Sequence, residues 1–296
     1  MCRFTLYLGP SIRLSKLLLE PEHSLIHQSV RSKERREPLN GDGFGVGWYA
    51  PRLSREPAVF HSVTPAWNDR NLRELAPVVA SPCVLAHVRA ATPGFGVDLA
   101  NCHPFAWHRQ LLMHNGYLNE FTRLRRRLLA PLCDEAFNLV RGSTDTEHLF
   151  AVFVDQLIRH EKADERARDP ALRLAEHLAA TLQHALAASH AAGVQAPHYL
   201  NLAVSNGQQA VVSRFTTDPA SEGDSLYVLQ GQLYETTAQE FGQRAQEERE
   251  PASIVSSERL TTARAWTAVP RNHLVVLERG VAPRLLALGP GAELAQ

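Results

Sequence analysis

The chain has 296 residues, of which 44% are hydrophobic and 21% charged, as is ordinary for a folded globular protein. Its 31 basic residues balance 31 acidic ones, which argues against a nucleic-acid-binding surface and against an acidic disordered tail. No run approaches the roughly 20 apolar residues of a membrane span, and no signal-peptide pattern opens the chain. The four cysteines show no CxxC spacing, so we expect a cytoplasmic protein with neither a membrane nor a nucleic-acid partner.

The first half of the chain alternates short strands with helices. Arg3–Leu8 predicts a strand that ends at Gly9-Pro10, and Ser11 favours the start of a short helix over 11–19. The charged run 31–37 is typical of an exposed loop. Apolar runs then predict strands over 58–63, 83–88 and 111–113, and helical spacing predicts helices over 68–75 and 119–129 and after the capping stretch 143–147.

Four glycines lie close together in the stretch Asn40-Gly41-Asp42-Gly43-Phe44-Gly45-Val46-Gly47. In a dinucleotide-binding loop such glycines follow a strand and open a helix, whereas these lead into a strand-like run. Glycines within a strand indicate a close approach of the backbone to a neighbouring element or a ligand. We therefore expect no nucleotide cofactor here.

The second half reads as a long helix over 171–192, followed by strands. The charged stretches 161–170 and 243–250 favour solvated surface connections. The order of strands, helices and again strands predicts an α+β domain of two sheets with helices outside them, rather than an alternating parallel fold. We expect one domain over 1–296, with a motif-rich part at 1–150 and the C-terminal strands within 198–280 completing the sandwich. These strands are predicted over 199–204, 210–215, 226–229, 253–256 and 274–277.

Cys2 lies directly behind the initiator Met1. Because the Cys side chain is small, we expect an aminopeptidase to remove Met1, which would leave an α-amine and a thiol on one residue. The amine has a pKa of about 7.7–8.0, so its neutral form is present near pH 7 and can accept the thiol proton, directly or through a water. The structural alternative is a small buried residue on the first strand.

Five further residues have the chemistry that acyl transfer to Cys2 would need. Asn115 and Gly116 follow an apolar strand and offer an amide and a backbone N–H to an oxyanion. Arg89, at the end of another strand, matches a carboxylate together with Thr92. Asp145, at a helix start, matches an ammonium. A ligand with an amino-acid head and a distant amide, such as glutamine or a γ-glutamyl amide, has this shape.

Each of these residues also has a structural interpretation. Asn-Gly commonly forms a turn, Asp145 can satisfy the N–H groups of its helix, and Arg89 can form an ion pair. The remaining cysteines are expected to be buried structural thiols: Cys83, Cys102 and Cys133. Three histidines lack the spacing of metal ligands, so no metal is expected: His87, His103 and His114.

Six stretches occur in one order along the chain: residues 1–3, 40–45, 89–94, 101–105, 114–117 and 143–147. In these stretches the sequence resembles the class II glutamine amidotransferases of the N-terminal-nucleophile hydrolase superfamily. The stretches 21–25 and 256–260 resemble its stand-alone members, which include the ergothioneine-pathway γ-glutamyl hydrolases.

The resemblance implies a four-layer αββα sandwich and hydrolysis of a γ-glutamyl amide bond. It implies that Cys2 attacks, that Asn115 and Gly116 hold the oxyanion, that Arg89 and Thr92 hold the α-carboxylate, and that Asp145 holds the α-ammonium.

Two positions depart from the family pattern, because Ala90 and Pro93 stand where many members carry Trp and His. Both changes alter the wall of the expected pocket, which favours a γ-glutamyl substrate larger than free glutamine. No segment after about residue 280 leaves room for a synthase domain, so we expect a hydrolase that acts alone or as a homo-oligomer. A glutaminase subunit that feeds a separate synthase, and a non-catalytic γ-glutamyl-binding protein, are the alternatives.

Overall fold

The structure is a computed structural model, and it describes residues 2–34, 39–91, 96–161, 169–231 and 251–295. Its centre is a pair of antiparallel sheets. The first has seven strands in the order β11-β9-β10-β1-β4-β2-β3, and the second has six in the order β13-β12-β8-β7-β6-β5.

The strands of the first sheet are β1 (Arg3–Arg13), β2 (Phe44–Trp48), β3 (Ala58–Ser62), β4 (Ala80–Val88), β9 (Tyr227–Gly231), β10 (Ala252–Ser256) and β11 (Trp266–Ala268). Those of the second are β5 (Phe105–Trp107), β6 (Gln110–Tyr117), β7 (Tyr199–Ser205), β8 (Gln209–Arg214), β12 (His273–Glu278) and β13 (Arg284–Ala287).

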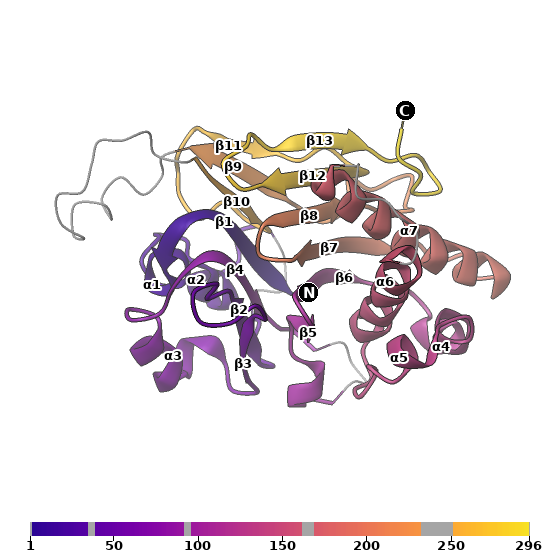
Figure 1. Cartoon of the computed structure of the whole chain (residues 1–296), viewed down its shortest axis with the longest axis horizontal. Coiled ribbons are helices and arrows are strands. Elements are labelled where there is room, and N and C mark those ends of the chain that lie inside the picture. Colours follow the sequence, from indigo (N-terminus) through magenta and orange to yellow (C-terminus); the bar gives the residue numbers. More distant parts are fainter. Residues whose placement is uncertain (1, 35–38, 92–95, 162–168, 232–250, 296) are drawn as a thin grey trace.

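Two groups of helices lie on opposite sides of this pair of sheets (Figure 1). The first group comprises α1 (Leu14–Leu18), α2 (Leu25–Val30) and α3 (Arg70–Leu75). The second comprises α4 (Phe121–Leu129), α5 (Asp134–Phe137), α6 (Asp145–Glu161) and α7 (Pro170–Ala191). Single 3₁₀ turns precede α3 and β5, over Ala66–Asn68 and Leu99–Asn101.

The hydrophobic core has three parts, one between each pair of adjacent layers. Because side chains alternate along a strand, Phe4 and Leu6 of β1 face the second sheet, and Tyr7 faces the helices α1–α3. In β6, Leu111 faces the first sheet, and Leu112 packs among the residues of α4, α6 and α7. Two sheets between two helical layers make the αββα sandwich that the sequence predicted. Its extent as one domain over 1–296 stays a prediction.

The start of the chain differs from the prediction. β1 continues through Gly9-Pro10 to Arg13, with its register to β4 shifting between Leu8 and Ile12. A break in register accommodates Pro10 within a strand, where Pro is otherwise disfavoured. As a result α1 begins only at Leu14, and Ser11 is not its N-cap.

The glycines of β2 mark the predicted close approach between the sheets. A Cβ atom on Gly45 would lie 2.1 Å from the carbonyl oxygen of His103, and one on Gly47 would lie 2.6 Å from Leu111 Cδ1. Contacts that short leave no room for a side chain. β2 can therefore pack this closely against the β5–β6 region only with glycine at positions 45 and 47.

Several further predictions need adjustment. Three strands were not expected from the sequence: β5 at 105–107, β11 at 266–268 and β13 at 284–287. These strands are three or four residues long, too short for a clear alternation. The stretch 243–250 and most of the connection 161–170 lie outside the described residues. Among the helices that the structure describes, none combines the length and apolar character that crossing a membrane requires.

Candidate active site

Cys2 directly precedes β1, which pairs with β4 in the first sheet. Since Arg3 pairs with Val88 of β4, Cys2 falls beside the residues that follow that strand. A small cavity of about 40 Å³ is lined by Cys2, Arg89, Gly116 and Asp145, together with Ala90, His103, His114, Thr144 and Thr146. Four of the residues singled out in the sequence therefore share one cavity, although they are up to 143 positions apart. Thr92 lies outside the described residues.

The thiol of Cys2 is enclosed, although the residue as a whole is half-buried. Its Sγ lies 3.7 Å from the carbonyl oxygen of Ala90. Burial raises the pKa of the thiol, and the hydrogen bond to Ala90 and the charge of Arg89 oppose that rise. A thiol of raised pKa is protonated at neutral pH, so it needs a base to become a nucleophile.

Arg89 is a buried cation, with 4% of its surface exposed. Its guanidinium donates at 3.4 Å to the carbonyl oxygens of Asp42 and Gly96. The ion pair considered from the sequence is absent, because no carboxylate in the described ranges pairs with Arg89. A buried charge without a counter-charge is costly, and a bound carboxylate would compensate it. The side chain of Asp42 accepts from Ala91 N at 2.8 Å and shapes the turn after Arg89.

Asn115 and Gly116 lie within β6 rather than in a turn, so the turn interpretation is wrong. Gly116 has φ +143°, and a Cβ there would lie 2.0 Å from the carbonyl oxygen of Tyr199; only glycine fits. Asn115 points toward the space between the sheets, where its Nδ2 donates to Ser257 Oγ at 3.4 Å. Its Oδ1 is buried without a hydrogen-bond partner among the described residues.

Asp145 is the first residue of α6. Its Oδ1 accepts from Thr146 N at 2.8 Å, and its Oδ2 accepts from Leu118 N at 2.8 Å. The carboxylate thus accepts from backbone N–H groups, as the structural interpretation of Asp145 predicted. It also lines the cavity. Because an ionised carboxylate has about four acceptor positions, these bonds leave capacity for a ligand N–H.

Three buried histidines lie close together beside the cavity, and two of them, His103 and His114, line it. His87 Nε2 donates to the carbonyl oxygen of His114 at 3.0 Å and lies 3.1 Å from His103 Nδ1. Burial lowers the pKa of all three, that of His87 to about 3, so they are neutral at pH 7. In the described part of the chain no group of three metal-type ligands occurs. Cys83 and Cys102 are buried thiols, as expected, whereas Cys133 is half-buried.

A buried carboxylate behind Cys2 was not assigned a role from the sequence. Glu258, 1% exposed, accepts from Arg3 Nε at 2.9 Å and from His23 Nε2 at 2.7 Å. It also accepts from Ser32 Oγ and from two backbone N–H groups, those of residues 33 and 34. Arg3 in turn donates to the carbonyl oxygen of Cys2 at 2.8 Å. The sequence signal was the stretch 256–260, which resembles the stand-alone members of the family and contains Glu258.

Two antiparallel sheets between two helical layers form the fold of the N-terminal-nucleophile type of amidotransferase, and in this chain a thiol, a cation and a carboxylate line one cavity. The model of the family described as "Glutamine amidotransferases class-II" matches residues 22–290. The chain belongs to this family, as its motifs indicated.

Relatives with curated names agree with this membership. The chain is 39% identical to "Probable glutamine amidotransferase DUG3" of Saccharomyces cerevisiae, over 94% of this chain and 82% of that one. It is 26% identical to "Gamma-glutamyl-hercynylcysteine sulfoxide hydrolase" of Mycobacterium tuberculosis, over 95% of each chain. The protein is accordingly a hydrolase that acts on amide bonds, rather than a non-catalytic binding protein.

Solved structures share the fold. A glutamine aminotransferase class-II domain protein from Silicibacter pomeroyi has a TM-score of 0.60 and 27% identity, over 94% of this chain and 95% of that one. An allosteric regulatory enzyme of purine biosynthesis has a TM-score of 0.56 and 16% identity, over 94% of this chain and 47% of that one. The second likeness concerns the fold alone.

Proposed function

We propose that the protein hydrolyses a γ-glutamyl amide bond through a thioester on Cys2 and releases glutamate. The carrying observation is that Cys2, Arg89, Gly116 and Asp145 line one cavity. Removal of Met1 makes the thiol and the α-amine neighbours on the same residue, which supplies the base that the raised pKa of the thiol requires.

In the first half-reaction the α-amine takes the proton of the Cys2 thiol, and the sulfur attacks the γ-carbonyl carbon. A C–S bond forms, and the oxyanion lies against the N–H of Gly116 and the amide of Asn115. The C–N bond then breaks, and the protonated α-amine gives its proton to the leaving amine. In the second half-reaction the α-amine takes a proton from water, the water oxygen attacks the thioester carbon, the C–S bond breaks, and the sulfur takes the proton back as glutamate leaves.

The amide of Asn115 supports this role once its orientation is considered. The two ends of an amide are assigned by their hydrogen bonds, and in one orientation Oδ1 is left buried without a partner. With the amide rotated by 180°, the Ser257 hydroxyl donates to Oδ1 and still accepts from Phe4 N at 3.1 Å. That arrangement satisfies Oδ1 and frees Nδ2 as a donor.

The glutamyl head would occupy the charged end of the cavity. The guanidinium of Arg89, with Thr92, pairs with the α-carboxylate in a bidentate way, and Asp145 accepts from the α-ammonium. This assignment explains why Arg89 is buried without a carboxylate partner in the described part of the chain. The cavity of about 40 Å³ holds only a few waters, so the glutamyl group requires the site to widen.

A screen for glutamate release from glutamine and other γ-glutamyl amides tests the proposal. Cys2→Ala should abolish release, and its circular dichroism and melting should match those of the parent. A glutamine analogue with an alkylating group should add its mass to the N-terminal peptide that begins with Cys2. Full activity in Cys2→Ala, or an active protein that retains Met1, would show that the thioester mechanism is wrong.

A second candidate is a glutaminase subunit that supplies ammonia to a separate synthase. The name of the Saccharomyces cerevisiae relative, a glutamine amidotransferase, favours it. In that case the protein should copurify with an ammonia-using enzyme, and its glutamine hydrolysis should rise when the partner and its acceptor are added. Unchanged glutamine hydrolysis in the presence of candidate synthases would favour the stand-alone hydrolase.

A further inference from the structure

Two loops meet beside the small cavity next to Cys2, and the buried side chain of Asn101 joins them. The 96–101 loop lies between β4 and β5 and ends in the 3₁₀ turn Leu99–Asn101. The 141–144 loop directly precedes α6. Asn101 is 4% exposed, and it is not one of the described residues that line the cavity. Any effect of Asn101 on a ligand there is therefore exerted through the two loops.

Both ends of the Asn101 amide are hydrogen-bonded. Oδ1 accepts from Ser143 N at 3.0 Å. Nδ2 donates to the carbonyl oxygen of Gly96 at 3.1 Å and to Ser143 Oγ at 3.4 Å. Because a backbone N–H only donates and a carbonyl oxygen only accepts, these partners fix the orientation of the amide. One side chain thus binds Gly96 in one loop and Ser143 in the other.

In the 96–101 loop, the partner of Asn101 is also a partner of Arg89. The carbonyl oxygen of Gly96 accepts from Nη1 and Nη2 of Arg89, each at 3.4 Å. A single oxygen atom therefore connects Asn101 to the guanidinium that would bind the α-carboxylate. Displacing this oxygen would displace the guanidinium, because Arg89 is buried and its described bonds go only to the carbonyl oxygens of Asp42 and Gly96.

In the 141–144 loop, Asn101 acts on the start of α6. Its partner Ser143 lies two residues before Asp145, and Thr144 between them lines the cavity. Thr144 Oγ1 accepts from Glu147 N at 3.3 Å, as the side chain of a helix N-cap does. The position of Ser143 therefore helps to fix the first turn of α6, on which the carboxylate of Asp145 lies.

The contact between the loops is too close for a side chain at Gly142. A Cβ atom there would lie 2.6 Å from Asn101 Oδ1 and 3.0 Å from Glu147 Oε2. Glu147 in turn accepts from Gly142 N at 2.7 Å and from Arg141 N at 2.8 Å. The 141–144 loop is thus held by Asn101 and by Glu147 of α6.

The separation of Arg89 and Asp145 matters because of the chemistry of the ligand. In an amino acid the α-carboxylate and the α-ammonium are bonded to the same carbon atom, so they lie at a fixed separation. A ligand can bind both side chains at full strength only where the protein holds them at the matching separation beforehand. Asn101 connects the loop that contacts Arg89 with the loop that precedes Asp145.

We propose that Asn101 is a positioning residue that sets the separation of Arg89 and Asp145. It thereby makes the recognition of the α-carboxylate and the α-ammonium cooperative. This inference rests on the proposed function, because it takes the head of the ligand to be a glutamyl group. The site then selects ligands that carry both groups on one carbon over ligands that carry either group alone.

The test measures, by calorimetry, the binding of three ligands to the full chain with Cys2→Ala. Glutamate has both head groups, glutarate lacks the ammonium, and 4-aminobutyrate lacks the α-carboxylate. Glutamate should bind about 10- to 100-fold more tightly than either of the others, the range of a hydrogen bond to a charged group.

Adding Asn101→Ala to this protein should weaken glutamate binding by about 10-fold. Glutarate and 4-aminobutyrate should change by about 2-fold or less, because each uses only one of the two charged side chains. A purely structural role would weaken all three ligands together. In the active parent, Asn101→Ala should correspondingly raise KM for a γ-glutamyl amide by about 10-fold and change kcat little.

Gly142→Ala tests the separation without removing the amide. Its φ is not positive, so alanine needs no strained backbone there. The added Cβ would meet Asn101 Oδ1 at 2.6 Å and should push the loops apart. In the protein with Cys2→Ala, this change should weaken glutamate binding selectively, as Asn101→Ala does.

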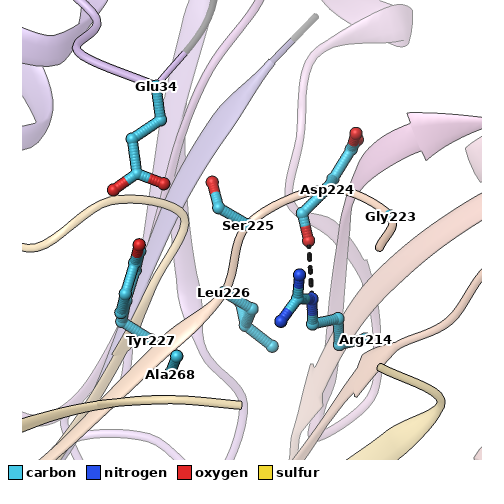
Figure 2. A pocket seen from close by; sticks show the side chains of 8 residues that line it. All are labelled: Glu34, Arg214, Gly223, Asp224, Ser225, Leu226, Tyr227 and Ala268. Carbon is cyan, nitrogen blue, oxygen red and sulfur yellow. Dashed lines mark hydrogen bonds between the residues drawn. The ribbon is translucent and has the colours of Figure 1, made fainter. Parts of the chain in front are cut away.

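Asn201 is the matched control for the loss of a buried amide. It is 1% exposed, and its Nδ2 donates to the carbonyl oxygens of Asp224 and Ser225 at 3.2 and 3.5 Å. Both of these residues line a different cavity, of about 430 Å³ (Figure 2). Asn201→Ala should lower the melting temperature, and glutamate should keep its advantage over glutarate and 4-aminobutyrate.

The outcomes separate this inference from the proposed function. Equal losses for the three ligands on adding Asn101→Ala, or unchanged glutamate binding, would overturn the positioning role. Absence of glutamate binding to Cys2→Ala would refute the assignment of Arg89 and Asp145 to the glutamyl head, and this inference with it. Absence of glutamate release from every γ-glutamyl amide would instead refute the enzymatic proposal. The calorimetric comparison would then still report on Asn101, because it requires no turnover.

Discussion

The carboxylate of Glu258 lies 2.9 Å from Arg3 Nε, and the same guanidinium donates to the carbonyl oxygen of Cys2 at 2.8 Å. Both side chains of the pair are 1% exposed. Glu258, near the far end of the chain, thus holds Arg3 in place. Arg3 in turn holds Cys2, which carries the proposed nucleophile. The hydrogen bonds from His23 and from Ser32 to Glu258 lower its pKa against the effect of burial.

Glu258→Gln should therefore cost both stability and catalysis. Removing one partner of a buried ion pair costs roughly 3–5 kcal/mol of unfolding free energy. Because Arg89 and Asp145 are untouched, we expect kcat to fall while KM changes little. Alkylation of Cys2 per folded molecule should slow as well, and Glu258→Asp should restore part of both rates.

The pair of Lys16 and Glu20, whose charged atoms lie 2.8 Å apart and whose side chains are 19% and 45% exposed, provides a more solvent-accessible control. Glu20→Gln should change the unfolding free energy by about 0.5 kcal/mol or less, since exposed pairs contribute little. If Glu258→Gln lost stability but kept the alkylation rate and kcat of the parent, the ion pair would be structural only.

Arg89 should behave in the opposite way to Glu258. It is buried without a carboxylate partner in the described part of the chain, so Arg89→Met removes a costly charge. We expect the unfolding free energy to stay equal or to rise, whereas KM for a γ-glutamyl amide should rise about 10- to 100-fold. Urea unfolding and steady-state kinetics measure the two effects. A loss of more than about 2 kcal/mol with an unchanged KM would make Arg89 a structural residue.

The layers of the fold could be predicted from local sequence patterns. Which distant residues come together in the candidate site could not. Alternation along β1 and the Ala- and Leu-rich composition of α7 are local properties, and they predicted two sheets with helices outside them. The four-layer sandwich was implied by the family resemblance. The contact of Glu258 with Arg3 joins residues 255 positions apart, and no pattern within either segment specifies it. The sequence around Arg89 fits an ion pair as well as a bound carboxylate. The placement of Arg89 near Cys2 was therefore expected only from the family resemblance.

Gly116→Ala should be among the most damaging single changes in the protein. The added Cβ would lie 2.0 Å from a backbone oxygen of Tyr199, at a φ of +143°, so β6 and β7 would have to separate. We expect a loss of about 3 kcal/mol or more in unfolding free energy, together with loss of glutamate release.

Gly193→Ala is the control for backbone conformation alone. Gly193 has φ +67°, and a Cβ there would meet nothing within 4 Å, so we expect a cost of about 1–2 kcal/mol and full activity. Similar losses in the two variants, measured by denaturant unfolding, would contradict the importance of the contact between β6 and β7.

The buried histidines should make the protein sensitive to acid. His87 Nε2 donates to the carbonyl oxygen of His114 at 3.0 Å, and Nδ1 has no partner among the described residues. Protonation would add an N–H with no acceptor in a buried site. Burial, and then the charges of Arg89, His114 and His61, lower the pKa of His87 to about 3 in the folded protein, against the hydrogen bond to His114.

Since this pKa is lower than the value of about 6.5 in an unfolded chain, the unfolded state binds the proton more tightly. The stabilisation is complete above about pH 6.5 and is lost as the pH falls toward 3, by about 1.4 kcal/mol per pH unit for one histidine. His87→Gln keeps a donor for the carbonyl oxygen but cannot titrate. Its unfolding free energy, measured in urea between pH 7 and pH 4, should therefore fall by about 1.4 kcal/mol less per pH unit than that of the parent once the pH is below about 6.5. Parallel pH profiles for the two proteins would mean that His87 does not control the acid sensitivity.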